Sequence, residues 1–356
     1  MRMALIRNSV ETLKAYVPGE QPADLSTIKL NTNENPYPPS PRVTEALAKL
    51  DSSSLRRYPD PVCQRLREGI AALHACGPER VFVGNGSDEV LALCTRAFVE
   101  DGGAVGYFEL SYSLYPVLAD IRAVRRRPQK LGERFEWQMP ETGGMDLFFL
   151  TNPNAPTGMQ YPAADVRRFC ESFEGVVVID EAYVDFADED NMDLALELEN
   201  VLVARTFSKA YSLAGVRVGY AVGPPRLIEA LGKIKDSYNV NVVSQRLALA
   251  ALEDRAHMLA NAARIRGTRE RLCGALRRLG FEVFPSRTNF VWAAPPDGAA
   301  PVFFEELRRR RILVRFFPGR LTSGYLRITV GTDEEIDRLI AALETIRPGK
   351  TSGDIP

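Results

Sequence analysis

The most informative stretch of this chain is Arg205-Thr206-Phe207-Ser208-Lys209-Ala210-Tyr211-Ser212-Leu213-Ala214-Gly215-Val216-Arg217. It follows the apolar run Val201 to Ala204, which is typical of a buried strand. Lys209 has hydroxyls, small residues and a second cation around it, whereas a solvated lysine normally shares a polar face with other charges. A partly desolvated lysine near Arg217 is expected to have a lowered pKa, because burial and a like charge both disfavour its protonated form. Such an amine is a good nucleophile and forms Schiff bases with aldehydes.

Three other side chains of this stretch suit a phosphate group. The hydroxyls of Thr206 and Ser208 can donate hydrogen bonds to phosphate oxygens, and Arg217 supplies a positive charge with several N–H donors. An aldehyde partner for Lys209 and a phosphate partner for the other three groups together indicate one molecule, pyridoxal 5′-phosphate. Ser-Lys pairs are also common in surface loops, so this interpretation needs support from the rest of the chain.

A second short apolar run, Val176 to Ile179, ends in Asp180-Glu181-Ala182-Tyr183. A carboxylate at the C-terminal end of a buried parallel strand lies where open α/β sheets bind ligands. Beside the pyridine nitrogen of the cofactor, Asp180 would keep that nitrogen protonated, so that the ring accepts electrons from a substrate carbanion. Tyr183 can reach the phenolic oxygen of the same ring. An aspartate at a strand end can also cap the next helix, so a purely structural role for Asp180 stays open.

Two turns follow other predicted strands. Val81-Phe82-Val83-Gly84-Asn85-Gly86-Ser87-Asp88-Glu89 is typical of a strand, a glycine turn and a helix start, where the backbone N–H groups of Gly86, Ser87 and Asp88 would bind an anion. Its acidic residues also suit a helix start with no ligand, and no third glycine completes a dinucleotide fingerprint. The stretch Thr151-Asn152-Pro153-Asn154-Ala155-Pro156-Thr157-Gly158 predicts a rigid turn that can include a cis Ala155–Pro156 bond.

In this order the four segments resemble the fold type I pyridoxal-phosphate aminotransferases. Three further segments make the chain similar to the histidinol-phosphate aminotransferases: Lys29-Leu30-Asn31-Thr32-Asn33-Glu34-Asn35-Pro36, Arg57-Tyr58-Pro59-Asp60 and Tyr325-Leu326-Arg327-Ile328-Thr329-Val330-Gly331-Thr332. The resemblance extends from about Tyr16 to about Leu343. It implies a pyridoxal-phosphate-dependent transaminase of histidine biosynthesis. The reaction would convert histidinol phosphate and 2-oxoglutarate into imidazole-acetol phosphate and glutamate.

The resemblance also implies a role for each matching residue. Lys209 would hold the cofactor as a Schiff base and, once released, would act as general base and acid. Asp180 would pair with the ring nitrogen, Tyr183 with the phenolic oxygen, and Tyr112 would stack on the ring, although a tyrosine in this pattern also suits a core position. The groups expected at the phosphate are Gly86, Ser87 and Asp88, Thr206, Ser208, Arg217, and Tyr58 of a neighbouring subunit, which implies a homodimer.

One position departs from the family. An asparagine usually stands directly before Pro-Thr-Gly and donates a hydrogen bond to the ring oxygen, but this chain has Ala155 there. Asn154 is one residue too early to be assigned that role. With one donor fewer, the pKa of the Schiff base is expected to rise, and Tyr183 would be the remaining donor.

Substrate choice is expected to depend on two arginines. Arg327 alternates with Tyr325 and Thr329 on one face of a predicted strand, where its guanidinium would bind the carboxylate of glutamate or 2-oxoglutarate. Arg315, on the preceding strand, is the candidate for the phosphate ester, unless it faces solvent. Tyr16 is expected to reach that phosphate across the dimer.

Three other functions remain open at this point. The first is an aromatic amino acid aminotransferase on the same scaffold, for which a second arginine would have no phosphate to bind. The second is a threonine-phosphate decarboxylase of the same fold, which would release carbon dioxide and need no keto acid. The third is a non-catalytic binding protein, which the presence of both Lys209 and Asp180 disfavours.

Composition and size fit a cytoplasmic enzyme. The net charge of −1 argues against a broad nucleic-acid or anionic-lipid surface, and we expect the basic runs Arg125 to Arg127 and Arg308 to Arg311 to be solvated faces. Five widely spaced cysteines with no Cys-x-x-Cys pair, and only two histidines, predict reduced thiols and no metal site. No signal peptide or apolar run of membrane-spanning length is evident.

The order of predicted elements indicates an α/β protein. Strands at 81–83, 104–107, 147–150, 176–179, 201–204 and 218–222 alternate with helical patterns, which favours a mostly parallel, seven-stranded type of sheet flanked by helices. A chain of 356 residues is expected to form two domains. We expect a large cofactor-binding domain at 34–242, a smaller α+β domain made of 1–33 and 243–347, and a flexible tail at 348–356. A long helical stretch at about 243–279 is expected to lead into the smaller domain. That domain is expected to have strands at 290–293, 312–316 and 325–330 and a closing helix at 333–346 capped by Thr332.

Overall fold

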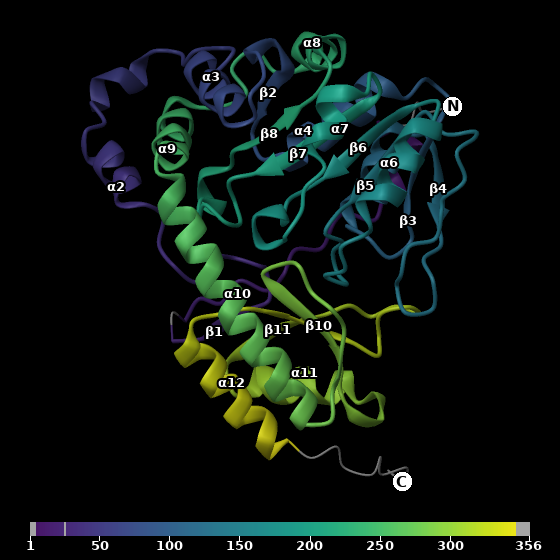
Figure 1. Ribbon diagram of the computed structural model, residues 1–356, viewed down its shortest axis with the longest axis vertical. Coiled ribbons are helices and arrows are strands. Elements are labelled where there is room, and N and C mark those ends of the chain that lie inside the picture. The colour runs from purple at the N-terminus through teal and green to yellow at the C-terminus, as the bar shows by residue number, and fades with distance from the viewer. Residues whose placement is uncertain (1–4, 25, 347–356) are drawn as a thin grey trace.

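The computed structural model describes residues 5–24 and 26–346, and its larger part is built on a seven-stranded sheet (Figure 1). The strands lie in the order β2-β8-β7-β6-β5-β3-β4. Their bounds are β2 Val81–Gly84, β3 Ala104–Phe108, β4 Arg125–Gln129, β5 Leu147–Thr151, β6 Val176–Asp180, β7 Val201–Thr206 and β8 Gly219–Val222. Only β8 runs antiparallel to its neighbours β2 and β7, so the mostly parallel sheet predicted from the sequence is confirmed.

Helices cover both faces of this sheet. Their bounds are α2 Pro41–Ala48, α3 Gln64–Leu73, α4 Ser87–Phe98, α5 Leu114–Arg122, α6 Ala163–Ser172, α7 Met192–Glu197, α8 Pro225–Ile234 and α9 Val242–Leu252, after a short α1 at Asn8–Glu11. Alternate residues of each strand point to opposite faces, so Val177 and Ile179 of β6 join one apolar cluster while Val178 joins the other. Both faces are buried, which explains the continuous apolar runs of the central strands.

A second, five-stranded sheet has the order β1-β11-β12-β10-β9. Its strands are β1 Ile28–Leu30, β9 Glu282–Val283, β10 Phe290–Ala294, β11 Ile312–Phe316 and β12 Leu326–Thr329, and its helices are α10 Arg255–Arg278, α11 Ala300–Arg309 and α12 Asp333–Thr345. In Figure 1 the long α10 continues from the end of α9, beside the large sheet, and runs down along the second sheet. Strand β1 pairs in parallel with β11, so the N-terminal segment belongs to a sheet formed otherwise by the last third of the chain. Thr332 caps α12 as predicted, in a reciprocal capping box with Glu335.

Two parts of the structure differ from the sequence-based expectation. The basic run Arg125–Arg127 is not only a solvated face but the start of edge strand β4, which pairs in parallel with β3. An edge strand tolerates charged side chains because solvent reaches its open side. The helical stretch expected at 243–279 is divided into α9 and α10 by a break at Glu253 and Asp254. The tail expected at 348–356 lies outside the described residues.

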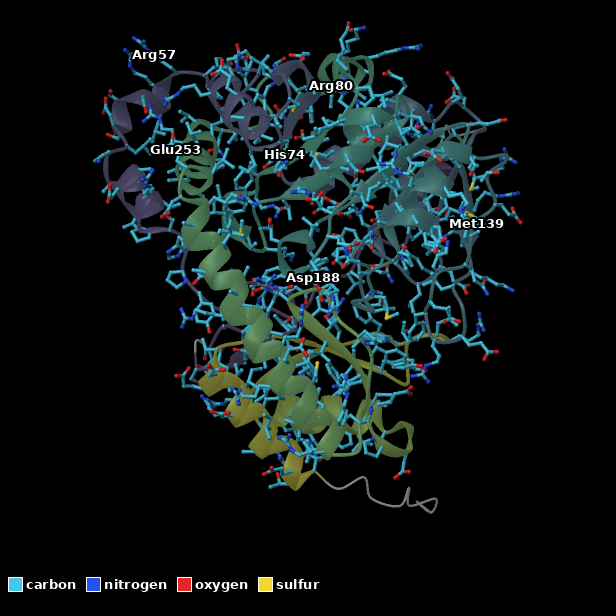
Figure 2. All side chains as sticks on the ribbon, in the orientation of Figure 1. Arg57, His74, Arg80, Met139, Asp188 and Glu253 are labelled. Atoms are coloured by element: carbon cyan, nitrogen blue, oxygen red, sulfur yellow. The ribbon has the colours of Figure 1, made fainter. Side chains whose placement is uncertain are left out.

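Polar side chains connect the part of the chain with the seven-stranded sheet to the part with the five-stranded sheet. Asp188, labelled in Figure 2, lies near the boundary between these parts, and its carboxylate pairs with Arg287 at 3.0 Å. All five cysteines are free thiols. Within the part of the chain that the structure describes, no helix has both the length and the apolar character needed to cross a membrane, and no group of His, Cys, Asp or Glu side chains is arranged to hold a metal ion.

Candidate active site

A cavity of about 380 Å³ lies at the carboxyl ends of β5, β6 and β7, and the second sheet supplies its opposite wall. Open α/β sheets bind ligands at this edge. The cavity collects most of the residues predicted for cofactor and substrate: Tyr16, Ser87, Asp88, Tyr112, Asp180, Tyr183, Thr206, Ser208, Lys209, Arg217, Arg315 and Arg327. Gly86 and Tyr58 are the two predicted residues that do not line it.

Lys209 is the nucleophile that this cavity presents. It stands three residues beyond the end of β7, and its Nζ donates a hydrogen bond to the backbone carbonyl of Thr32 at 3.2 Å. Burial, followed by the charge of Arg327 and less by that of Arg217, lowers the pKa of Lys209 to about 8. The direction of this shift is as predicted, but its electrostatic part comes mainly from Arg327 rather than from Arg217.

Asp180 lies at the bottom of the cavity, at the end of β6. Its carboxylate accepts hydrogen bonds from the hydroxyl of Tyr115 at 2.9 Å and from the backbone N–H of Ala182 at 3.2 Å. Burial nevertheless raises the pKa of Asp180 to about 6. Among the described residues no cation forms an ion pair with this carboxylate. A cationic ring nitrogen would supply the missing charge, so the site fits a pyridinium ring.

Tyr183 and Ala155 lie where the ring oxygen is expected. The hydroxyl of Tyr183 accepts a hydrogen bond from the side-chain amide of Asn33 at 2.9 Å. Ala155 is buried in the cavity wall and has no polar side-chain atom. Asn154 turns its amide away, toward the carbonyl of Leu110 at 3.0 Å and the hydroxyl of Thr157 at 2.9 Å. Asn154 therefore does not replace the asparagine that is missing at position 155.

The phosphate end of the site is formed where α4 begins. Gly86 precedes α4 with a φ of 84°, and a Cβ on it would lie 2.4 Å from Nη2 of Arg217. Arg217 Nη1 donates to the hydroxyl of Ser208 at 3.4 Å, and its Nη2 lies 3.4 Å from the carboxylate of Asp88. A helix N-terminus, one guanidinium and the hydroxyls of Thr206 and Ser208 thus converge, and this donor set fits a phosphate group.

Two tyrosines stand on the remaining wall of the cavity. Tyr112 donates from its hydroxyl to Asp88 at 3.2 Å, and Tyr16 packs edge-on against the ring of Tyr112 with 5.9 Å between centroids. Tyr16 lines the cavity of its own chain, and its expected reach to the phosphate across a dimer stays a prediction. Tyr58 lies outside this cavity, 79% exposed, and stacks on Tyr238 at 4.3 Å.

Arg315 and Arg327 form a pair of cations on neighbouring strands. They are directly opposite each other in the antiparallel pairing of β11 and β12. Arg315 donates to the carbonyls of Pro18 at 3.1 Å and Val17 at 2.7 Å, whereas Arg327 donates through Nη2 to the carbonyl of Asn31 at 3.1 Å. The Nε of Arg327 is buried without a hydrogen-bond partner among the described residues. An unpaired buried N–H that borders a cavity is suited to an anionic ligand group.

Sequence reasoning missed several residues that the fold brings to this site. They are Asn31, Thr32 and Asn33 after β1, Thr151 and Tyr115 beside Asp180, and Phe317 and Thr322 near the arginine pair. The polar segment Lys29–Pro36, with its three asparagines, supports the family resemblance, but the sequence alone does not indicate what these asparagines contact. Phe317 packs under both guanidinium groups, with Cζ to ring-centroid distances of 5.0 Å for Arg315 and 5.3 Å for Arg327.

Comparisons with known proteins agree with this geometry. Residues 26–343 match the family described as aminotransferase class I and II. The chain is 43% identical over 350 residues to a histidinol-phosphate aminotransferase of Citrifermentans bemidjiense, covering 98% of this chain and 100% of the relative. It is 45% identical over 349 residues to the Geobacter sulfurreducens enzyme of the same name, covering 97% and 100%.

A solved structure supports the same assignment. The histidinol-phosphate aminotransferase from Sinorhizobium meliloti, in complex with pyridoxal 5′-phosphate, superposes with a TM-score of 0.86 at 25% identity, covering 96% of this chain and 97% of the other. The family match spans most of the chain, and the relatives align over nearly their full length. The chain therefore belongs to the class I and II aminotransferases.

Proposed function

We propose that this protein binds pyridoxal 5′-phosphate through Lys209 and transfers the amino group of histidinol phosphate to 2-oxoglutarate. The products would be imidazole-acetol phosphate and glutamate, as part of histidine biosynthesis. The observation that carries the proposal is one cavity that holds a half-buried amine, an unpaired buried carboxylate and a pair of arginines. When bound, the cofactor supplies a reactive aldehyde and a ring that accepts electrons.

Each cofactor contact in this proposal follows from a group in the cavity. With a pKa of about 8, the amine of Lys209 is uncharged in about a tenth of the molecules at pH 7, so it can attack the aldehyde and later carry a proton. Asp180 holds the positive ring nitrogen, and Tyr183 donates to the ring oxygen. Arg217, Ser208 and the first N–H groups of α4 bind the phosphate.

The arginine pair accounts for the two substrates. Arg327 would bind the carboxylate of glutamate or 2-oxoglutarate, because its buried guanidinium still has an unused donor. Arg315, which is half-buried at the cavity rim, would bind the phosphate of histidinol phosphate. The names of the curated relatives support this substrate over an aromatic amino acid, whose side chain would leave Arg315 without an anion.

Substitution of the two arginines tests this proposal. Arg315→Ala is expected to lower kcat/KM for histidinol phosphate by about 10- to 100-fold, the loss expected for charged hydrogen bonds, and to change the value for glutamate less than about threefold. Arg327→Ala is expected to impair the glutamate half-reaction. Arg309→Ala, which removes an exposed arginine paired with Glu306, is the control. Equal losses for both substrates in Arg315→Ala, faster turnover of phenylalanine or tyrosine, or release of carbon dioxide without a keto acid would contradict the proposal.

We also propose the assembly and cellular setting. The protein would act in the cytoplasm as a homodimer with no nucleic-acid partner, and its active sites would lie between subunits, with Tyr58 of one chain at the phosphate of the other. The exposed position of Tyr58 beside Tyr238 supports this. The division into a domain at 34–242 and a discontinuous domain at 1–33 and 243–347 is supported by the separate sheets.

A further inference from the structure

We propose that Asn33 is a positioning residue that fixes the hydroxyl of Tyr183 as a hydrogen-bond donor into the cavity. The inference rests on the role proposed above for Tyr183 at the ring oxygen. It assigns a task to the asparagine-rich segment after β1. It also explains how one tyrosine can serve the ring oxygen at a site where Ala155 offers no amide.

The orientation of the Asn33 amide follows from its other hydrogen bonds. The backbone N–H of Asn33 donates to the hydroxyl oxygen of Thr329 at 3.0 Å. The hydrogen of that hydroxyl is therefore directed at its second partner, Oδ1 of Asn33, also at 3.0 Å. Because Oδ1 faces Thr329, the NH₂ group must face Tyr183, to which it donates at 2.9 Å.

This bond also determines which way the tyrosine hydroxyl points. A phenol oxygen that accepts a hydrogen bond from Asn33 has its own hydrogen left to donate elsewhere. Tyr183 lines the cavity, so the cavity is the direction open to that hydrogen. Without Asn33, the hydroxyl would be free to donate to another acceptor and to withdraw from the ring oxygen.

The network around Asn33 is buried and rigid. Asn33, Thr329 and Asn289 are each at most 2% exposed, and the carbonyl of Asn33 accepts a hydrogen bond from Asn289 at 3.0 Å. Asn33 has a φ of 57°, in the left-handed region that asparagine tolerates better than most residues. Among the described residues Oδ1 of Asn289 has no hydrogen-bond partner, but both ends of the Asn33 amide are engaged, Oδ1 by Thr329 and the NH₂ group by Tyr183. The amide of Asn33 therefore has one favoured orientation, which holds the hydroxyl of Tyr183 in place.

Charges of both signs face Tyr183, and its burial keeps the hydroxyl protonated. They come from Arg327 on β12, Asp180 at the end of β6, Asp88 in α4 and Lys209, whose Nζ lies 5.8 Å from the centre of the ring. Burial raises the pKa of Tyr183, while Arg327 and the bond from Asn33 oppose that rise. Tyr183 therefore remains a proton donor at neutral pH.

The test uses the absorption band of the bound cofactor, titrated with pH in the holoenzyme. A ring oxygen that loses a donor becomes more negative and holds the nearby Schiff-base proton more tightly, so the titration midpoint rises. Asn33→Gly removes the amide and keeps the left-handed backbone, and we expect a rise of about half a unit to one unit. Tyr183→Phe is expected to give a larger rise. Adding Asn33→Gly to Tyr183→Phe is expected to give no further shift.

A second variant and a control complete the design. Asn33→Asp has nearly the shape of asparagine, but its carboxylate accepts a hydrogen bond from the hydroxyl of Tyr183 and so draws that hydroxyl away from the ring oxygen. The titration midpoint of Asn33→Asp should therefore rise more than that of Asn33→Gly. Asn261→Ala removes a buried asparagine of α10 that bonds to Pro38 and His257, and its midpoint should not change.

The outcomes separate the two proposals. If Tyr183→Phe leaves the midpoint unchanged, the proposed contact of Tyr183 with the ring oxygen fails, and the premise fails with it. If Tyr183→Phe raises the midpoint while both Asn33 variants leave it unchanged, the inference about Asn33 is overturned and the role of Tyr183 stands. The inference about Asn33 would also be overturned if Asn33→Gly raised the titration midpoint by the same amount in the otherwise unchanged protein and in Tyr183→Phe. Asn33 would then not act through the tyrosine.

Discussion

Two ionisable residues, the half-buried Lys209 and the buried Asp180, show how this site prepares for its cofactor. Burial lowers the pKa of Lys209 to about 8 and raises the pKa of Asp180 to about 6, so burial disfavours the charged form of each group. Each group therefore costs stability until a ligand supplies its partner. A bound cofactor would relieve both costs, by converting the amine of Lys209 and by placing a cation beside Asp180.

The first prediction concerns the stability of the cofactor-free protein. Asp180→Asn should stabilise it by about 2–3 kcal/mol at pH 7, because a native pKa of about 6 exceeds the unfolded value near 3.8. In that situation the native state binds more protons between the two values, so stability falls as pH rises from about 4 to about 6. The gain in Asp180→Asn should grow over this range and stay constant above it. Denaturant unfolding of the apoprotein at several pH values measures this gain.

The same substitution should have the opposite effect once cofactor is present. The neutral amide cannot pair with a ring cation, so both the affinity for the cofactor and the rate of transamination should fall. The rate should fall by about 100-fold or more, which is the usual loss when one electrostatic contact at a reacting group is removed. A destabilised apoprotein, or an apoprotein whose stability gain is the same at pH 4 and pH 7, would contradict this account of Asp180.

At the residue scale, the sequence identified the groups that carry charge or a nucleophile. Lys209, Asp180 and Arg217 could be predicted because each follows a recognisable strand or turn. Tyr115 and Asn33 could not, because their roles depend on which segments fold beside Asp180 and Tyr183. The hydrogen bond between Asn33 and Tyr183 joins residues 150 positions apart, and no local pattern encodes that distance.

Among the elements, the ends of β6 and β7 are tied together by a buried ion pair. Glu181 accepts hydrogen bonds from Nε of Arg205 at 2.9 Å and from the backbone N–H of Asn191 at 2.6 Å, and its carboxylate also lies 2.7 Å from Nη2 of Arg205 in an ion pair. Its side chain is fully buried. This pair fixes the spacing between the strand that carries Asp180 and the strand that leads to Lys209.

The second prediction tests this connection between strands. Glu181→Gln should lower the free energy of unfolding by about 3 kcal/mol, because Asp190 is then the one carboxylate among the described residues that pairs with the buried guanidinium of Arg205. Glu197→Gln, which breaks an exposed pair with Arg167, should cost less than about 0.5 kcal/mol. Thermal and denaturant unfolding of both variants provide the comparison. Equal costs would mean that the buried pair does not hold the two strands.

Most elements of the large sheet could be predicted, since a strand buried on both faces has a continuous apolar run. Strand β4 could not, because its first three residues are arginines and only its pairing with β3 makes it a strand. The antiparallel direction of β8 was also not predicted, since a short apolar run has the same pattern in either direction. Strand β9 has two residues, which is too few to show the alternation of apolar and polar side chains that identifies a strand.

On the scale of the whole molecule, the cavity exists because two sheets meet over it. The N-terminal segment after β1 reaches from the second sheet to the first, where Asn35 donates to the backbone of Lys209 at 3.3 Å and of Ala210 at 3.0 Å. The sequence suggested this discontinuous arrangement only through the family resemblance. Pairing of β1 with β11 depends on contacts across most of the chain, which composition and periodicity do not reveal.

The third prediction concerns the proposed dimer. Tyr58→Ala should weaken cofactor binding about tenfold, the loss of one hydrogen bond to a charged group. A mixture of Tyr58→Ala and Lys209→Ala subunits should regain activity at limiting cofactor. In each mixed dimer one site then combines an intact Lys209 with an intact Tyr58 from the other chain. No regain after subunit exchange would show that Tyr58 does not serve the neighbouring site.

The most direct test of the whole account is the covalent attachment of the cofactor. Borohydride reduction of the holoprotein, followed by proteolysis and mass spectrometry, should place a pyridoxyl group on Lys209, and Lys209→Ala should lose both the label and the visible absorption band. A label on another lysine, or no label on a protein that still transfers amino groups, would contradict the central claim.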